Sequence, residues 1–308
     1  MKWAKWKARI YRAGLFIGAL IFLVQLISGV QAFQSNQLPV GFRSIALWSI
    51  VGMVLVVGLQ IVNWSHLLKI VGVHLPLLEL SKGYVLSSLP KYIPGSIWGY
   101  ISRSQWLSQE HEIPHGLTNL ANLFEIEVTL VSAGSVILLG LGLVNGSWLY
   151  LVAALLLPAT ILSLTRTLIR FILRKGWFGL ATFPNQPSMD IRFLWLATLI
   201  SGLQWLILGG ATLLLVAGVK PQLQFNLREW LLAVQSFTLA WLGGFFVIFV
   251  PGGLGIRELA LTGLIMTNFS ANYQTATLVA IGSRLVYSAG EIIWLGIGLL
   301  QKAGGKGK

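Results

Sequence analysis

Long runs of apolar residues, separated by short polar stretches, make up most of this chain. A helix needs about 20 apolar residues to cross a bilayer, and six uninterrupted runs are near or above this length: residues 12–32, 44–64, 117–143, 148–165, 193–218 and 275–300. Two further apolar regions, 80–103 and 230–268, are interrupted by proline and glycine. The pattern predicts an all-α integral membrane protein, a polytopic helical bundle forming a single transmembrane domain over residues 1–308.

The composition supports this class and excludes several others. Hydrophobic residues make up 56% of the chain and charged residues 10%, whereas a soluble domain carries about 25% charged residues. The absence of cysteine excludes disulfides, thiolate metal sites and cysteine nucleophiles. The net charge of +13 could indicate nucleic-acid binding, but the basic residues cluster at the ends of apolar runs, as the positive-inside rule requires. We therefore expect no nucleic-acid partner.

The basic residues also predict the orientation. We assume a cytoplasmic amino terminus and interrupted regions that turn back to the side from which they entered. Of the 22 basic residues, 15 then lie inside: Lys2, Lys5, Lys7, Arg9, Arg12, Lys69, Lys82, Arg166, Arg170, Arg174, Lys175, Arg192, Lys302, Lys306 and Lys308. Only Arg43, Lys220 and Arg228 lie outside, and Lys91, Arg103, Arg257 and Arg284 stay at membrane depth. This bias predicts an inner or plasma membrane protein with both termini cytoplasmic.

The basic amino terminus and the apolar run after it have an alternative reading. Val30-Gln31-Ala32 fits a signal-peptide cleavage site. We prefer a retained first membrane helix, because the run from Ala13 to Val30 is long enough to span.

The two interrupted regions resemble each other. The first contains Pro94, Gly95 and Gly99 followed by Arg103, and the second contains Pro251, Gly252, Gly253 and Gly255 followed by Arg257 and Glu258. A long uninterrupted run begins at a similar distance after each Pro-Gly pair, and the two runs cross in opposite directions in the predicted topology. This pattern is typical of an inverted repeat with broken, re-entrant helices. The repeat units cover roughly 44–143 and 193–300.

Broken helices offer a binding site for an anion. Proline and glycine free backbone groups that a membrane tolerates only beside protein or water. A helix that begins there presents N–H groups and a positive dipole end, and Arg103 and Arg257 could add bidentate phosphate contacts. The alternative is a pair of kinks in ordinary helices, with arginines that extend to the membrane surface.

Acidic residues in the membrane runs form a second group. An ionisable side chain at this depth normally faces a cavity or a partner. We assign Glu125, Arg284 and Glu291 to a polar groove, and prefer Glu125 to Glu127 because Asn122 shares its side of the helix. The alternative is a set of structural ion pairs.

These motifs resemble the transmembrane region of lysylphosphatidylglycerol synthases, a family of flippase-like membrane domains. The resemblance rests on Leu-Pro-x-Tyr-Ile-Pro-Gly…Gly…Arg, on Pro-Gly-Gly-Leu-Gly-Ile-Arg-Glu and on the late Ser-Arg-Leu-Val-Tyr helix. It implicates Pro94, Gly95, Gly99, Arg103, Pro251, Gly252, Gly253, Gly255, Arg257, Glu258 and Arg284 in substrate binding. It also implies movement of lipids or lipid-linked headgroups between leaflets.

Two departures from the family pattern affect these expectations. The synthase domain is missing from the sequence, which ends at Lys308, so we expect a stand-alone member and do not infer lysyl transfer. Ile126 occupies the place where family members often carry an arginine after the glutamate, which leaves the partner of Glu125 open.

Two apparent cofactor motifs fail on physical grounds. His111-Glu112-Ile113-Pro114-His115 matches H-E-x-x-H, but Pro114 is tolerated only in the first turn of a helix, so both histidines cannot share one. The Gly304-Gly305-Lys306 tail lacks the spacing of a phosphate-binding loop. We therefore expect no metal and no nucleotide cofactor.

The sequence favours a transporter over an enzyme: a flippase that moves an anionic headgroup, with membrane lipids or polyprenyl-phosphate-linked intermediates as partners. One alternative is a membrane-embedded transferase with Glu125 or Glu291 as general base. Another is a non-transporting partner subunit for a cytoplasmic transferase of cell-envelope synthesis.

Overall fold

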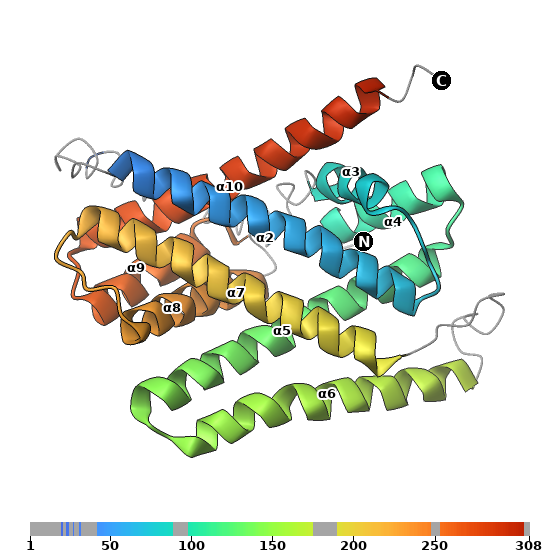
Figure 1. Cartoon of the computed structure of the whole chain (residues 1–308), viewed down its shortest axis with the longest axis horizontal. Coiled ribbons are helices and arrows are strands. Elements are labelled where there is room, and N and C mark those ends of the chain that lie inside the picture. Colours follow the sequence, from blue (N-terminus) through green and yellow to red (C-terminus); the bar gives the residue numbers. More distant parts are fainter. Residues whose placement is uncertain are drawn as a thin grey trace, which may run out of the picture. The chain divides into compact units, whose positions relative to one another are not determined.

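The computed structural model describes residues 42–88, 98–174, 190–247 and 253–304, together with Leu20, Leu23, Val24, Ile27 and Gln31. Within these residues all regular structure is helical, in nine helices and no strand (Figure 1). The helices are α2 (Phe42–Ile70), α3 (Leu77–Ser88), α4 (Trp98–His111), α5 (His115–Asn145), α6 (Trp148–Arg174), α7 (Ile191–Val219), α8 (Leu227–Phe246), α9 (Ile256–Phe269) and α10 (Tyr273–Gly304).

Five of these helices are long and apolar enough to cross a membrane: α2, α5, α6, α7 and α10. They contain 27 to 32 residues, or about 40–48 Å at 1.5 Å per residue, against a hydrocarbon core of about 30 Å. They confirm five of the six predicted full-length spans. The sixth, 12–32, lies outside the described residues except for isolated positions. The chain is therefore an all-α, multi-pass membrane protein.

Local sequence signals set the turn between α5 and α6. α5 ends at Asn145, and Gly146 follows in the left-handed conformation with φ 65°, which glycine adopts without the cost of a Cβ. The N–H groups of Gly146 and Ser147 both donate to the carbonyl of Gly142, which the end of the helix would otherwise leave unpaired. α6 begins directly afterwards, and the two helices pack side by side as an antiparallel pair (Figure 1).

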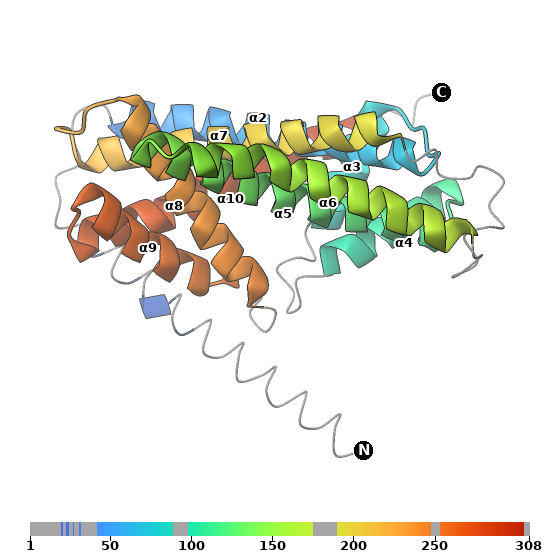
Figure 2. The same cartoon turned by 90° about the horizontal axis from the view of Figure 1, so that it is seen from below.

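The helices around the two interruptions are shorter. α3, α4 and α9 contain 12, 14 and 14 residues, about 18–21 Å, too short for a bilayer core of about 30 Å. α8 and α9 lie side by side in both views (Figures 1 and 2). The interruptions fall largely in 89–97 and 248–252, so Pro94, Gly95, Pro251 and Gly252 lie outside the described residues.

The H-E-x-x-H stretch is broken as the sequence predicted. α4 ends at His111, α5 begins at His115, and the intervening Glu112 has a left-handed φ of 54°. The two histidines therefore belong to different helices.

The chain divides into two compact units. In its described part, unit one holds α2 up to Val54, α7 from Ile207, α8, α9 and α10 up to Ile292. Unit two holds the remainder of α2, α7 and α10 together with α3, α4 from Gly99, α5 and α6. The predicted repeat units of roughly 44–143 and 193–300 stay a prediction.

Each unit has its own buried apolar side chains. Trp64, Leu107, Phe124, Leu162 and Leu194 form part of one cluster in unit two, drawn from five helices. In unit one, α8, α9 and α10 bury Phe237, Ile265 and Val279.

Candidate functional site: buried charges beside the interrupted helices

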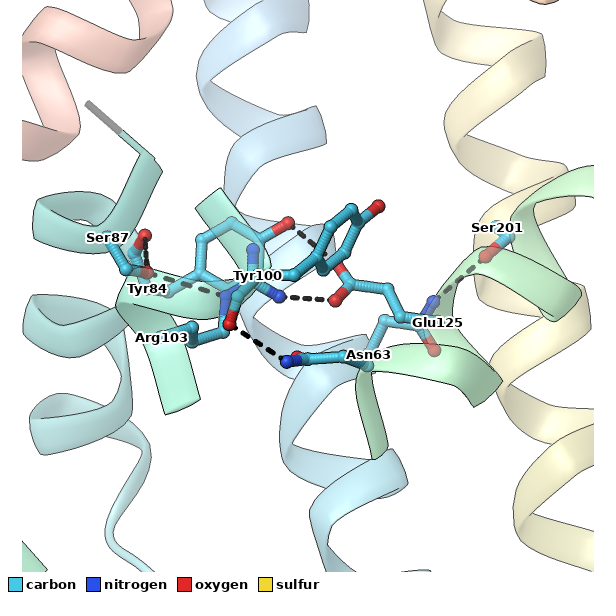
Figure 3. Close-up of polar contacts among 8 residues, drawn as sticks. Asn63, Tyr84, Ser87, Tyr100, Arg103, Glu125 and Ser201 are labelled. Atoms are coloured by element: carbon cyan, nitrogen blue, oxygen red, sulfur yellow. Dashed lines mark hydrogen bonds and ion pairs between the residues drawn. The ribbon is translucent and has the colours of Figure 1, made fainter. Parts of the chain in front are cut away.

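A buried ion pair joins α4 to α5 in unit two. Nη1 of Arg103 donates to Oε2 of Glu125 (Figure 3). The hydroxyl of Tyr84, on α3, donates to the other carboxylate oxygen at 3.1 Å. Nε of Arg103 donates to the hydroxyl of Ser87, also on α3, at 3.4 Å. One carboxylate therefore links three helices, and its charge is balanced within the chain.

Aromatic rings surround the same guanidinium. The ring centroids of Tyr84, Trp64 and Tyr100 lie 4.1, 5.0 and 5.5 Å from the guanidinium carbon of Arg103, within the range of cation–π attraction. Asn122, one turn before Glu125 on α5, donates to the carbonyl of Tyr100 at 3.0 Å and so fixes α4 further. Arg103 has both a carboxylate and aromatic rings as partners, which makes it a structural element of unit two.

The described polar contacts of unit two continue toward α7. Asn63 of α2 donates to the hydroxyl of Ser201 on α7 at 2.8 Å (Figure 3). Trp205, one turn further along α7, donates to Ser132 of α5 at 3.0 Å. Such hydrogen bonds between helices are the usual way in which polar side chains are satisfied at membrane depth.

The glycines of the second interruption are required by backbone geometry. Gly253 and Gly255 have φ of 65° and 82°, a region that residues with a Cβ rarely enter. A Cβ on Gly253 would lie 2.8 Å from Cα and 2.9 Å from the carbonyl oxygen of Gly244 in α8. Glycine at 244 and 253 therefore lets the end of α8 meet the start of α9 backbone to backbone.

The side chain of Glu258 caps the amino terminus of its own helix, α9. Its Oε2 accepts a hydrogen bond from the N–H of Gly255 at 2.6 Å, and its Oε1 accepts one from Nη1 of Arg284, on α10, at 2.5 Å. The residue is 1% exposed. The carboxylate thus occupies the helix N-terminal position that the sequence suggested for an external anion, and it neutralises Arg284.

Arg257 differs from Arg103 and Arg284 because it has no carboxylate partner. The rings of Phe237 and Tyr287 lie 4.6 and 5.7 Å from its guanidinium carbon. Its Nη2 is buried and has no hydrogen-bond partner among the described residues. All nine side-chain carboxylates of the chain belong to the described residues. Glu258 and Glu291 are near enough to attract Arg257. No carboxylate oxygen, however, lies within 4.0 Å of a guanidinium nitrogen of Arg257, the distance that defines an ion pair.

Glu127 lies on the opposite side of α5 from the ion pair. Its Oε1 accepts a hydrogen bond from the hydroxyl of Thr165 on α6. Glu125 and Glu127 therefore contact different helices, as two residues two positions apart on a helix must. Glu291, predicted as part of a polar groove, is half-buried on α10.

The structure groups the predicted residues in two sets, one in each unit. Arg103 and Glu125 are in contact in unit two, and Gly253, Gly255, Arg257, Glu258 and Arg284 are assembled in unit one. Gly99 is buried at the start of α4. The aromatic rings that surround Arg103 were not predicted from the sequence. Only Tyr100, three residues before Arg103 on one helix face, carried a local signal for it.

Comparisons with known proteins bear on the whole chain. The family model described as "Lysylphosphatidylglycerol synthase TM region" matches residues 11–293 of the 308. A search of curated proteins finds no match.

Proposed function

Because this chain belongs to the lysylphosphatidylglycerol synthase TM-region family, we propose that it moves a phosphate-bearing lipid between the leaflets of an inner or plasma membrane. The substrate is a phospholipid or a polyprenyl-phosphate-linked intermediate with an anionic headgroup. The observation that carries the proposal is the half-buried Arg257 at the second interruption. Its Nη2 is buried without a hydrogen-bond partner among the described residues, and none of the nine side-chain carboxylates forms an ion pair with it.

An arginine in this position has a physical cost that a ligand would remove. A charged side chain at membrane depth costs several kcal/mol unless a partner compensates it. The rings of Phe237 and Tyr287 supply only part of that compensation. Guanidinium groups bind phosphate oxygens in a bidentate manner, so a headgroup phosphate is the partner that fits Arg257.

The backbone next to Arg257 is held in a defined position. Gly253 and Gly255, at the start of α9, have positive φ, and Gly253 lies against Gly244 of α8. Glu258 and Arg284 hold this start in position through the carboxylate contacts of Glu258. In this arrangement Arg284 and Glu258 orient the binding arginine.

The short helices favour the re-entrant arrangement. Helices of 12 to 14 residues beside an interruption are too short to cross the bilayer. In the proposed arrangement they end near its midplane, where a transporter of this type holds its substrate. Within unit one, the headgroup would pass along polar side chains that include Arg284 and Glu291, while the lipid tails stay in the bilayer. A cytoplasmic transferase that makes or uses the lipid is the protein partner we propose.

The test is leaflet exchange in proteoliposomes. Fluorescent phosphatidylglycerol, a polyprenyl phosphate and an uncharged glycosyl-diacylglycerol are compared for wild type, Arg257→Gln and Arg257→Lys. We expect Arg257→Gln to slow exchange of the two phosphate lipids about tenfold or more, since a charge-assisted hydrogen bond contributes about 1.5–3 kcal/mol and about 1.4 kcal/mol is a factor of ten. Arg257→Lys should be intermediate, because lysine keeps the charge without the bidentate geometry.

Arg228→Gln is the matched control. Arg228 precedes Glu229 near the start of α8, and its side chain is 65% exposed, so its neutralisation should leave exchange unchanged. Equal rates for Arg257→Gln and Arg228→Gln would overturn the role of Arg257. Absence of exchange above protein-free liposomes for either phosphate lipid would overturn the proposed function.

A further inference from the structure

Glu127 is a membrane-depth carboxylate that the proposed lipid site does not use. It lies on α5, a helix of 31 residues that can span a membrane. Its place, 12 residues after the first residue of α5, is about 18 Å along the helix, well within the depth of a bilayer. Glu125 and Glu258, by contrast, have arginine partners.

Glu127 has a neutral partner instead. Its hydrogen bond comes from the hydroxyl of Thr165 on α6, and no Lys, Arg or His in the described part of the chain lies within 4.0 Å of its carboxylate. The helices that contact α5 in unit two carry other charged groups, and none of them pairs with Glu127: Glu79 and Lys82 on α3, Arg103, Glu110 and His111 on α4, Arg166 and Arg170 on α6, and Arg192 on α7.

This environment suits a carboxyl group that gains and loses a proton. An ionised carboxylate with only a neutral partner is costly at membrane depth, and binding a proton removes the charge. A threonine hydroxyl can donate to the carboxylate and can accept from the protonated acid. Thr165 therefore satisfies Glu127 in both states, which an arginine or lysine partner would not.

The position on α5 connects this group to the ion pair of unit two. Glu125, two residues earlier on the same helix, holds Arg103 of α4 and Tyr84 of α3. A change in the contact between Glu127 and α6 therefore acts on the helix that also holds the first interrupted region. We propose that Glu127 is a proton-binding site and that its protonation drives or regulates the lipid movement. The coupling half of this inference rests on the proposed function.

Proton binding is tested without transport. Infrared difference spectra between acidic and alkaline pH are recorded on the protein in detergent micelles, for wild type, Glu127→Gln, Thr165→Val and Glu112→Gln. We expect Glu127→Gln to lose one carboxylic C=O band, and Thr165→Val to shift the same band because the hydroxyl partner is gone. Glu112→Gln, the same chemical change at an exposed residue, should keep the band. Identical spectra for wild type and both α5–α6 variants overturn the proposal.

Coupling is tested in proteoliposomes with an imposed pH difference. We expect the rate of phospholipid exchange in wild type and Glu112→Gln to change with the pH difference, and the response to be lost in Glu127→Gln while exchange continues. An unchanged response in Glu127→Gln overturns the coupling although the proposed function stands. If wild type moves no lipid at any pH, the proposed function fails, and the infrared result alone decides whether Glu127 binds a proton.

Discussion

Arg103, Arg257 and Arg284, which the sequence predicts at membrane depth, have different surroundings. Arg103 contacts Glu125 and three aromatic rings, and Arg284 contacts Glu258. Arg257 has rings beside it and a buried Nη2 without a hydrogen-bond partner among the described residues. A buried ion pair leaves neither charge without a partner, whereas a guanidinium without a carboxylate partner has donors that can bind an anion. The proposed function thus gives the same residue type two different roles.

The ion pair of unit two makes a prediction about stability. Glu125→Leu leaves Arg103 buried without its carboxylate, so we expect a loss of about 3–5 kcal/mol in the free energy of unfolding. The double change Arg103→Leu with Glu125→Leu should lose clearly less, because apolar residues at both positions leave no isolated charge. Unfolding in mixed detergent and SDS micelles measures both. A double variant that is less stable than the single variant would contradict the structural role of Arg103.

At the scale of elements, the two units have a similar ion pair between helices. In each, a buried ion pair joins the 14-residue helix after an interruption to the next long helix, α4 to α5 and α9 to α10. The order of the charges is reversed, because arginine lies on α4 but glutamate on α9. The inverted relation between the units stays a prediction.

The contact between α8 and α9 makes a second prediction. Gly253→Ala places a Cβ 2.8 Å from Cα of Gly244 and forces alanine to adopt a φ of 65°. The left-handed backbone alone costs about 1–2 kcal/mol, so we expect at least this loss in the free energy of unfolding, with slower lipid exchange. Gly263→Ala is the control on the same helix, since its Cβ meets no atom within 4 Å and alanine favours a helix by about 1 kcal/mol. Equal effects of the two changes would show that the backbone contact is not needed.

At the scale of the whole molecule, selective labelling tests the predicted orientation of the chain in the membrane. The chain has no cysteine, so single cysteines at Glu112, Asn145, Gln222 and Gln274 can each be labelled selectively. All four residues are exposed near helix ends. We expect a membrane-impermeant maleimide to label Asn145→Cys, Gln222→Cys and Gln274→Cys in intact cells, and Glu112→Cys only after permeabilisation.

The pattern of labelling also distinguishes re-entrant regions from broken spans. Glu112 follows the first interrupted region, and Gln274 follows the second. If the first region crosses the membrane completely, all four cysteines change sides relative to our expectation; if only the second does, only the cysteine at Gln274 changes sides. The unmodified, cysteine-free chain gives the background signal.

Much of the architecture was predictable from the sequence. The apolar runs predicted the starts of five long helices to within two residues, because helix formation at membrane depth depends on local hydrophobicity and on hydrogen bonds within the segment. The ends were less exact: α2 and α6 continue to Ile70 and Arg174, beyond the predicted ends at 64 and 165. The glycines at 253 and 255 were likewise identifiable as special positions, since Pro-Gly-Gly-Leu-Gly breaks a helix by local geometry.

The sequence by itself determined the class of protein, the positions of the long helices and the presence of charged residues within the apolar regions. Only the tertiary structure decided how these charges are paired. Arg103 and Glu125 are 22 residues apart, Glu258 and Arg284 are 26 apart, and Glu127 finds Thr165 38 residues later. An ion pair or hydrogen bond forms only when two side chains come within about 4 Å, a distance fixed by helix packing. For this reason only the structure could single out Arg257 and Glu127 among similar residues.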